Sequence, residues 1–241
     1  MKEIPLAGGD VNPVVRVGDT VRRPRGPAAV RALLEWYERA GFDGAPRFLG
    51  FDEQGREVLS FVEGEPAFAP VPYGDAIVEA IGRLLRRAHD AQEGFVPPAS
   101  DWDDHVPGPG PGEVIGHCDL FWTNVIFRDG LPSALIDWEL AAPTTRVLDV
   151  ALAATYWGGV RVDRQLREWG LPLERRGERL RLLCDGYGLE ARARARLLDE
   201  LLAQRRGRVE RGDWRVTSRD VIVENLHWLE ERRDQLARFL A

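Results

Sequence analysis

The residues with the clearest chemical potential form a short run, HCDLFWTN, at positions 117–124. An apolar segment, the turn Asp129-Gly130 and a second apolar segment ending at Asp137 follow it. Asp-Gly between two apolar segments is typical of a β-hairpin, and a hairpin brings its two ends together. Asn124 and Asp137 are therefore predicted to converge on one point. An amide oxygen and a carboxylate are ligands that suit Mg²⁺ better than Zn²⁺.

Asp119 lies five residues before Asn124, so its carboxylate is expected to reach an acceptor hydroxyl facing a metal-bound phosphate. A catalytic aspartate, an asparagine ligand and a second aspartate ligand are the set that kinases use. The alternative is that all three residues only form turns, as Asp and Asn often do; their order and spacing favour catalysis. Cys118 lies inside the run, but a nucleophilic thiol needs a base partner and a lowered pKa, so we expect no reaction there.

The composition limits the possible partners. The chain has 241 residues, with 33 basic and 39 acidic side chains and a net charge of -6. A sequence-independent grip on nucleic acid would need a basic face, so nucleic acid is not expected as a partner. The only lysine is Lys2, so any cation that grips phosphate must be an arginine. Neither a signal segment nor a membrane-spanning run is visible, so we expect a cytoplasmic protein with no membrane partner.

The elements that must position these residues fall into two parts. Valine-rich segments and turn signals predict strands in the first part, and Pro27 and Gly41 delimit one helix there. The predicted strands are 11–17, 20–23, 47–51 and 57–61. A linker over 62–72 and a Pro/Gly-rich loop over 95–112 flank a long amphipathic helix. Apart from the hairpin, the second part is predicted to be helical, over 147–156, 174–187, 190–209 and 218–240.

The motif HxDxxxxN, followed by Ile136-Asp137-Trp138-Glu139, resembles the aminoglycoside phosphotransferase family. The segments 146–151 and 84–89 also look like parts of that family. The resemblance implies an α+β, protein-kinase-like fold of two lobes. Residues 1–62 would form a reduced amino-terminal, nucleotide-binding lobe, and residues 63–241 the carboxy-terminal lobe that carries catalysis and substrate binding.

The resemblance also implies roles for individual residues. Asp119 is expected to be the catalytic base or to orient the acceptor hydroxyl, and His117 to brace the loop. Asn124 and Asp137 are expected to hold Mg²⁺.

On the nucleotide side, the implied hinge that binds the adenine edge consists of Ser60, Phe61, Val62 and Glu63. Arg22, or alternatively Arg23, takes the place of the family's phosphate-binding lysine, and Glu35 on the following helix is its candidate partner. Asp149 is expected to brace the loop or to start a helix. The phosphate-covering loop departs from the family pattern, because Gly8, Gly9 and Gly18 do not form GxGxxG.

The implied reaction moves the γ-phosphoryl group of Mg-ATP (or GTP) to a hydroxyl of a small molecule such as an aminoglycoside, amino alcohol or sugar. Acidic residues of the late helices would receive a cationic acceptor, namely Asp199, Glu200 and Glu224. The missing lysine leaves a degenerate, non-catalytic nucleotide- or metabolite-binding protein as the main alternative. A helical protein–protein scaffold is a third. The acceptor, the choice of nucleotide and the oligomeric state stay open.

Overall fold

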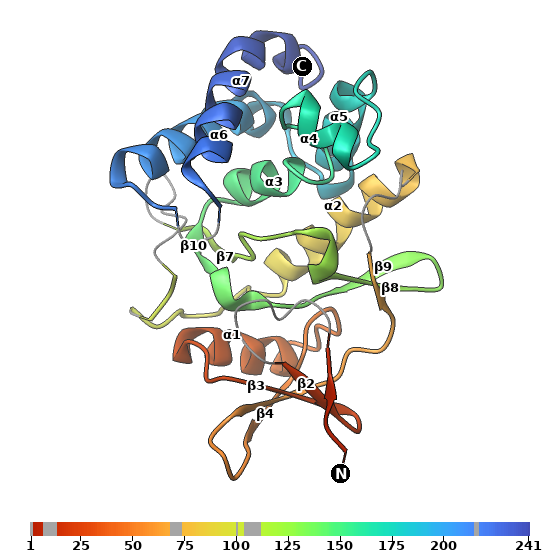
Figure 1. Ribbon diagram of the computed structural model, residues 1–241, viewed down its shortest axis with the longest axis vertical. Coiled ribbons are helices and arrows are strands. Elements are labelled where there is room, and N and C mark those ends of the chain that lie inside the picture. The colour runs from red at the N-terminus through yellow and green to blue at the C-terminus, as the bar shows by residue number, and fades with distance from the viewer. Residues whose placement is uncertain (1, 7–13, 68–73, 100, 104–111, 215–216) are drawn as a thin grey trace.

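A computed structural model describes residues 2–6, 14–67, 74–99, 101–103, 112–214 and 217–241. A strand-rich lobe lies at one end of the molecule and a helical lobe at the other, and a hairpin and short strands lie between them (Figure 1). The expected kinase-like α+β architecture is confirmed. Predicted features at Gly8, Gly9 and 104–111 lie outside the described residues.

The strand-rich lobe is a five-stranded antiparallel sheet in the order β1-β2-β3-β5-β4. Its strands are β1 (Ile4–Pro5), β2 (Val15–Val17), β3 (Thr20–Arg23), β4 (Phe48–Phe51) and β5 (Glu57–Ser60). One helix, α1 (Ala28–Arg39), begins directly after Pro27 and packs Val30, Leu33 and Leu34 into the core. Proline suits this position because its fixed φ already matches the helix and its missing N–H would have no helical partner there.

The predicted hairpin forms β8 (Val125–Arg128) and β9 (Leu131–Leu135), and β6 (Glu65–Pro66) pairs with β8 on its other side. Asp129 and Gly130 both have positive φ, at 51° and 76°, as a tight two-residue hairpin turn requires. The linker prediction for 62–72 therefore missed β6. A two-residue strand with a proline has no alternation from which to infer it.

The helical lobe is built from α2 (Asp75–Asp90), α3 (Arg146–Ala154), α4 (Asp163–Glu168), α5 (Arg176–Tyr187), α6 (Ala191–Arg211) and α7 (Arg219–Ala237). The sequence did not indicate α4, which is too short to show a helical period. It also missed two strands, β7 (Val114–Gly116) and β10 (Ala142–Thr144), which pair antiparallel below α3. Both strands are mostly buried, so neither shows the alternation of a half-exposed strand. None of the helices in the described part combines the length and apolar character of a membrane span.

Helices α2 and α5 approach each other closely because glycine lines their contact. A Cβ on Gly186 would overlap the backbone carbonyl of Glu79, and one on Gly82 would overlap that of Leu183. The contact carries Tyr187 to His89, whose rings lie 5.6 Å apart. The two helices therefore position His89, which contacts the Asp149 carboxylate below the loop at 117–124.

Candidate active site

The loop at 117–124 is held from below by one buried carboxylate, that of Asp149 on α3. Its two oxygens accept hydrogen bonds from the backbone amides of His117 (3.0 Å) and Cys118 (2.8 Å). His89 Nε2 lies 3.0 Å from the same carboxylate, and His89 Nδ1 lies 2.8 Å from the Tyr187 hydroxyl. Burial raises the pKa of Asp149, but His89 and the Cys118 amide outweigh it and hold that pKa below its ordinary value. The expected loop-bracing role of Asp149 is confirmed.

Gly116 allows this close approach. A Cβ at this position would lie 2.8 Å from Asp149 Cγ and would also overlap Thr144. Cys118 has a φ of 64°, a conformation that costs energy in a residue other than glycine and that the two amide bonds to Asp149 hold in place. Burial raises the pKa of the Cys118 thiol well above its usual range, as expected for an unreactive cysteine.

His117 connects the loop to the strand that precedes Asp137. Its Nε2–H donates to the backbone carbonyl of Ile136 at 2.8 Å, and its ring lies 4.6 Å from that of Trp138. The Nδ1 atom is buried and has no hydrogen-bond partner among the described residues. His117 therefore braces the hairpin end. Trp157 adds a second brace that the sequence did not indicate, because its indole N–H donates to the Leu120 carbonyl at 2.8 Å.

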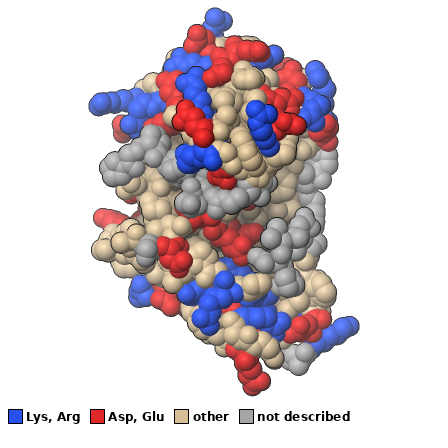
Figure 2. Space-filling view, turned by 60° about the vertical axis from the view of Figure 1, so that its left-hand side comes forward, with Lys and Arg blue, Asp and Glu red and all other residues tan. Residues whose placement is uncertain are grey.

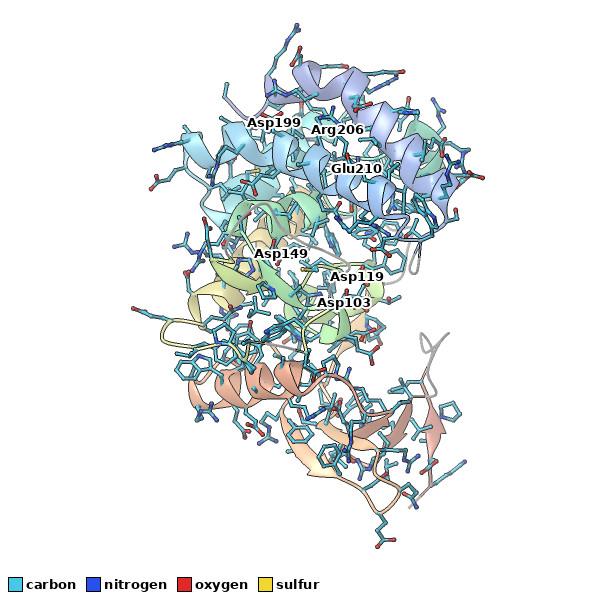
Figure 3. The ribbon with its side chains drawn as sticks, turned by 90° about the vertical axis from the view of Figure 1, so that its left-hand side faces the viewer. Asp103, Asp119, Asp149, Asp199, Arg206 and Glu210 are labelled. Atoms are coloured by element: carbon cyan, nitrogen blue, oxygen red, sulfur yellow. The ribbon has the colours of Figure 1, made fainter. Side chains whose placement is uncertain are left out.

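Asn124 and Asp137 come together as predicted. The amide of Ile136 donates to the Asn124 carbonyl at 2.9 Å, which places Asp137 directly beside Asn124. The Asn124 Nδ2 group donates to the Asp119 carbonyl (3.0 Å) and carboxylate (3.1 Å), so its side-chain oxygen is directed away from Asp119. Asp137 has a φ of 61° and a half-exposed side chain. Figure 3 shows Asp119 in the middle of the molecule, between the strand-rich lobe and the upper helices, with Asp149 above it and to its left.

The donor set fits Mg²⁺ shared with a nucleotide. The described residues contain no group of three or more His, Cys, Asp or Glu side chains that would form a complete protein cage. Asn124 and Asp137 offer two hard oxygens, and Mg²⁺ is commonly held by one or two protein groups together with substrate phosphates.

The Asp119 carboxylate is largely buried, and burial raises its pKa above the ordinary aspartate value. The charge of Asp137 raises that pKa further, whereas His117, Asn124 and a hydrogen bond from Tyr156 lower it. A carboxylate with a raised pKa is a better proton acceptor than an exposed one. Asp119 also lines a cavity in the helical lobe, together with Tyr156 and Arg161. Asp119 therefore lies between the Asn124–Asp137 pair and this cavity.

The cation that reaches this centre is Arg23, not Arg22. Arg23 Nη1 lies 3.4 Å from the Glu139 carboxylate and 3.9 Å from that of Asp137. Arg22 points the other way and pairs with Asp52 at 3.7 Å. Side chains alternate along a strand, so adjacent arginines of β3 face opposite sides, and the sequence alone could not choose between them.

The expected partner Glu35 is also wrong. Glu35 lies on the exposed face of α1, and among the described residues it forms no ion pair with either arginine. Glu57 on β5 takes this place. It is fully buried, and its carboxylate accepts from Arg23 Nε (2.9 Å), Arg31 Nη1 (2.8 Å) and the Gly26 amide (3.0 Å). Because β3 and β5 are adjacent in the sheet, they place Glu57 opposite Arg23, a pairing that only the register decides.

The hinge residues 60–63 run from β5 toward β6. The amides of Ser60 and Phe61 already donate to the carbonyls of Arg47 and Asp19, both at 2.9 Å. The amides of Val62 and Glu63 have no hydrogen-bond partner among the described residues, so these two hinge donors are available to a ligand. Glu63 is exposed, and its carboxylate pairs with Arg16 at 3.1 Å.

The hinge also forms one wall of a cavity of about 400 Å³. Its other walls include Phe42, Asp43 and Arg128. None of Arg23, Asp119 or Asp137 lines it. This cavity therefore lies apart from the residues that would hold phosphate.

Comparison with known proteins decides the family. Residues 98–183 match the model of the phosphotransferase enzyme family, the segment that contains the loop at 117–124, the hairpin and α3. The chain is also 41% identical over 211 residues to the trifolitoxin immunity protein of Rhizobium leguminosarum bv. trifolii, covering 83% of this chain and 79% of the relative. The chain belongs to the phosphotransferase enzyme family.

Solved structures support the fold of this phosphotransferase over its whole length. A choline/ethanolamine kinase family protein from Mesorhizobium loti superimposes with a TM-score of 0.62 at 16% identity, covering 100% of this chain and 91% of the other. Amicoumacin kinase hAmiN, solved with AMP-PNP, Ca²⁺ and Ami, superimposes with a TM-score of 0.61 at 12% identity, covering 98% and 88%. At these identities the likeness concerns the fold alone. The predictions of a kinase-like fold and of a small-molecule kinase are confirmed.

Proposed function

We propose that this phosphotransferase moves the γ-phosphoryl group of Mg-ATP or Mg-GTP to a hydroxyl of a small acceptor in the cytoplasm. The observation that carries the proposal is the arrangement of Asp119, Asn124 and Asp137 at the gap between the lobes, with Arg23 beside Asp137. Residues 1–62 would bind the nucleotide, and residues 63–241 would supply catalysis and acceptor binding. Family membership supports phosphoryl transfer over the scaffold alternative.

Each part of this arrangement has a defined task in the proposal. Asp119 accepts the proton of the acceptor hydroxyl and orients that hydroxyl toward the phosphorus. Asn124 and Asp137 hold Mg²⁺, which when bound neutralises charge on the phosphate oxygens. Arg23 contacts the phosphates, and the Val62 amide donates to the base. His117 and Asp149 keep the loop in place, so that the reacting groups are positioned before the substrates arrive.

The experiment that tests this proposal is product formation. Wild-type protein is incubated with Mg-ATP or Mg-GTP and a panel of amino sugars, amino alcohols, sugars and hydroxy acids, and phosphorylated product is sought by mass spectrometry. We expect product, and we expect Asp119→Ala to remove it while leaving nucleotide binding intact. Nucleotide binding without any product in the wild type would support the non-catalytic alternative.

The named relative favours one particular biological role. The 41% identity to an immunity protein supports the proposal that the acceptor is a toxic small molecule, which phosphorylation inactivates. Expression in a toxin-sensitive bacterium tests this role. Wild-type protein should protect the cells, and Asp119→Asn should not. Equal protection by both would show that the chain acts by binding alone.

A further inference from the structure

A cavity of about 80 Å³ opens beside Asp119 on the side away from Asn124 and Asp137. Loop residues Cys118 and Asp119 form one wall, and side chains of α3, of the segment that follows it, of α6 and of α7 form most of the others. Its volume corresponds to only two or three water molecules, far less than a drug-sized ligand needs. It therefore accommodates a small head group rather than a whole amino sugar.

The walls of this cavity are basic. Among the described residues, Arg161, Arg205 and Arg208 line it, against the single carboxylate of Asp119. Arg205 is buried and donates to the backbone carbonyls of Asn225 (3.0 Å) and Val160 (3.2 Å). Within the described part of the chain, neither Arg161 nor Arg205 has a carboxylate partner. Arg208 donates to the carbonyl of Asp213 at 3.4 Å.

Arg161 is held by stacking, and one of its N–H groups has no hydrogen-bond partner among the described residues. Its guanidinium stacks on the rings of Tyr156 (5.0 Å) and Trp169 (4.7 Å). Its Nε–H is buried and finds no hydrogen-bond partner among the described residues. Tyr156, on whose ring the guanidinium stacks, lines the same cavity as Asp119. A buried cation without an anion is costly, and a bound anion would relieve that cost.

The acidic residues expected to receive a cationic acceptor do not line this cavity. Asp199 forms an ion pair with Arg233, and Glu224 forms one with Arg164. Glu200 accepts a hydrogen bond from the Thr145 hydroxyl. Figure 3 places Asp199 on α6, well above Asp119, with Asp103 beside Asp119 at the gap between the lobes. The charged side chains that line this cavity beside Asp119 are therefore arginines, not the acidic residues that were expected to receive the acceptor.

We propose that the acceptor is a hydroxy acid, or the hydroxyl- and carboxylate-bearing end of a larger molecule, whose carboxylate binds Arg161 and Arg205 while its hydroxyl faces Asp119. This inference rests on the proposed function. The hydroxyl oxygen forms the new bond to phosphorus as the bond to the nucleoside diphosphate breaks. The hydroxyl proton passes to Asp119, and the acceptor's carboxylate is unchanged.

The test compares acceptors that differ only in the carboxylate. D-glycerate, L-serine and a peptide ending in serine are each assayed beside their carboxamides, with ethanolamine and kanamycin as cationic acceptors. We expect at least one acid to be phosphorylated with a kcat/KM at least tenfold above that of its amide. The free acids and the peptide distinguish a small metabolite from a larger molecule.

Arg161→Gln and Arg206→Gln form the matched pair of variants. Arg206 lies on α6 next to Arg205, but it is exposed and paired with Glu230 of α7, outside the cavity. We expect Arg161→Gln to raise KM for the acid about tenfold to hundredfold, the usual effect of losing a hydrogen bond to a charged group. Its kcat/KM for the amide should be unchanged. Arg206→Gln should match the wild type for both.

Two further readouts separate this inference from the proposed function. Mg-nucleotide affinity is measured by calorimetry in all three proteins, and thermal stabilisation by D-glycerate and by sulfate in the wild type and Arg161→Gln. Equal turnover of amines, amides and acids would contradict the proposal of an anionic acceptor but not the proposed function. An equal effect of Arg161→Gln on every acceptor would do the same. So would the absence of both anion stabilisation and carboxylate-dependent turnover. Failure of the wild type to bind Mg-nucleotide would instead overturn the proposed function.

Discussion

At the scale of single residues, the exchange of roles between Arg22 and Arg23 leads to a direct comparison. We expect Arg23→Gln to weaken Mg-nucleotide binding about tenfold to hundredfold, because a charged donor beside Asp137 is lost. Arg22→Gln should leave affinity within about twofold, because Arg22 pairs with Asp52 on the other face. Calorimetric titration measures both.

A third variant separates charge from packing at this position. Arg23→Lys keeps the charge and should recover part of the nucleotide affinity, although it cannot reproduce the contacts to both Glu57 and Glu139. A greater loss of affinity in Arg22→Gln than in Arg23→Gln would restore the original assignment.

The raised pKa of Asp119 predicts opposite effects on activity and stability. Because Asp119 must be ionised to accept a proton, kcat/KM should fall as the pH drops through its raised pKa, at a higher pH than for an exposed aspartate. A carboxyl group whose pKa is raised by folding stabilises the protein below its unfolded pKa, and this contribution is lost as the pH rises through the folded pKa. At neutral pH its charge is therefore a destabilising feature of the fold.

Asp119→Asn tests this opposition. We expect kcat to fall about 10²–10⁴-fold and Tm at neutral pH to rise, because the buried charge is removed. The gain in Tm should vanish toward acid pH, where the wild-type carboxyl group is protonated. Steady-state kinetics and calorimetric scans at several pH values measure the two effects. A lower Tm at neutral pH would contradict the assigned pKa direction.

At the scale of elements, the fixed relation between α3 and the catalytic loop depends on Asp149. Asp149→Asn should destabilise the protein by about 3 kcal/mol, since it breaks a buried carboxylate–histidine contact and weakens two amide bonds. The wild-type contribution should be lost as the pH falls through the lowered folded pKa of Asp149. Urea unfolding measures the change. Asp90→Asn is the control, because Asp90 is half-exposed and should cost less than about 1 kcal/mol.

The contact of α2 with α5 leads to another prediction at this scale. Gly186→Ala should destabilise the protein by about 2 kcal/mol or more, because the added methyl group meets the Glu79 backbone and the helices must separate. Gly74→Ala, at the N-cap of α2, meets no atom of the described residues within 4 Å and should destabilise the protein by less than about 1 kcal/mol. Equal effects in urea unfolding would show that α2 and α5 do not limit each other's approach.

At the scale of the whole molecule, the two lobes are expected to share a nucleotide through Mg²⁺. Figure 2 shows acidic side chains gathered at mid-height of one face, above a group of basic side chains of the strand-rich lobe. A ligand that binds only the folded protein stabilises it by mass action, so Mg-nucleotide at about 100 times its Kd should raise the free energy of unfolding by about 2.7 kcal/mol. EDTA should remove most of this stabilisation.

Asp137→Asn provides the control, since it replaces the charged one of the two proposed metal ligands with a neutral amide and so weakens the hold on Mg²⁺. Its Tm with nucleotide should respond little to Mg²⁺, whereas without nucleotide it should resemble the wild type. Thermal scans with and without EDTA measure both. A Mg²⁺ response equal to that of the wild type would place the metal elsewhere.

The sequence by itself determined the features that depend on residues close along the chain. The loop at 117–124, the turn at Asp129-Gly130 and the start of α1 after Pro27 are encoded locally, because φ preferences and hydrophobic period act over a few residues. Asn124 and Asp137 could be paired because a tight turn leaves little choice of register.

Only the tertiary structure decided which groups meet across longer distances. The strand register chose Arg23 over Arg22 and Glu57 over Glu35, and the packing of three helices placed Arg161 and Arg205 near Asp119. No local preference encodes such contacts, because they depend on how separate elements pack. The loop that the sequence indicated thus borders a cavity lined by three arginines, and this cavity is the basis of the anionic acceptor proposed above.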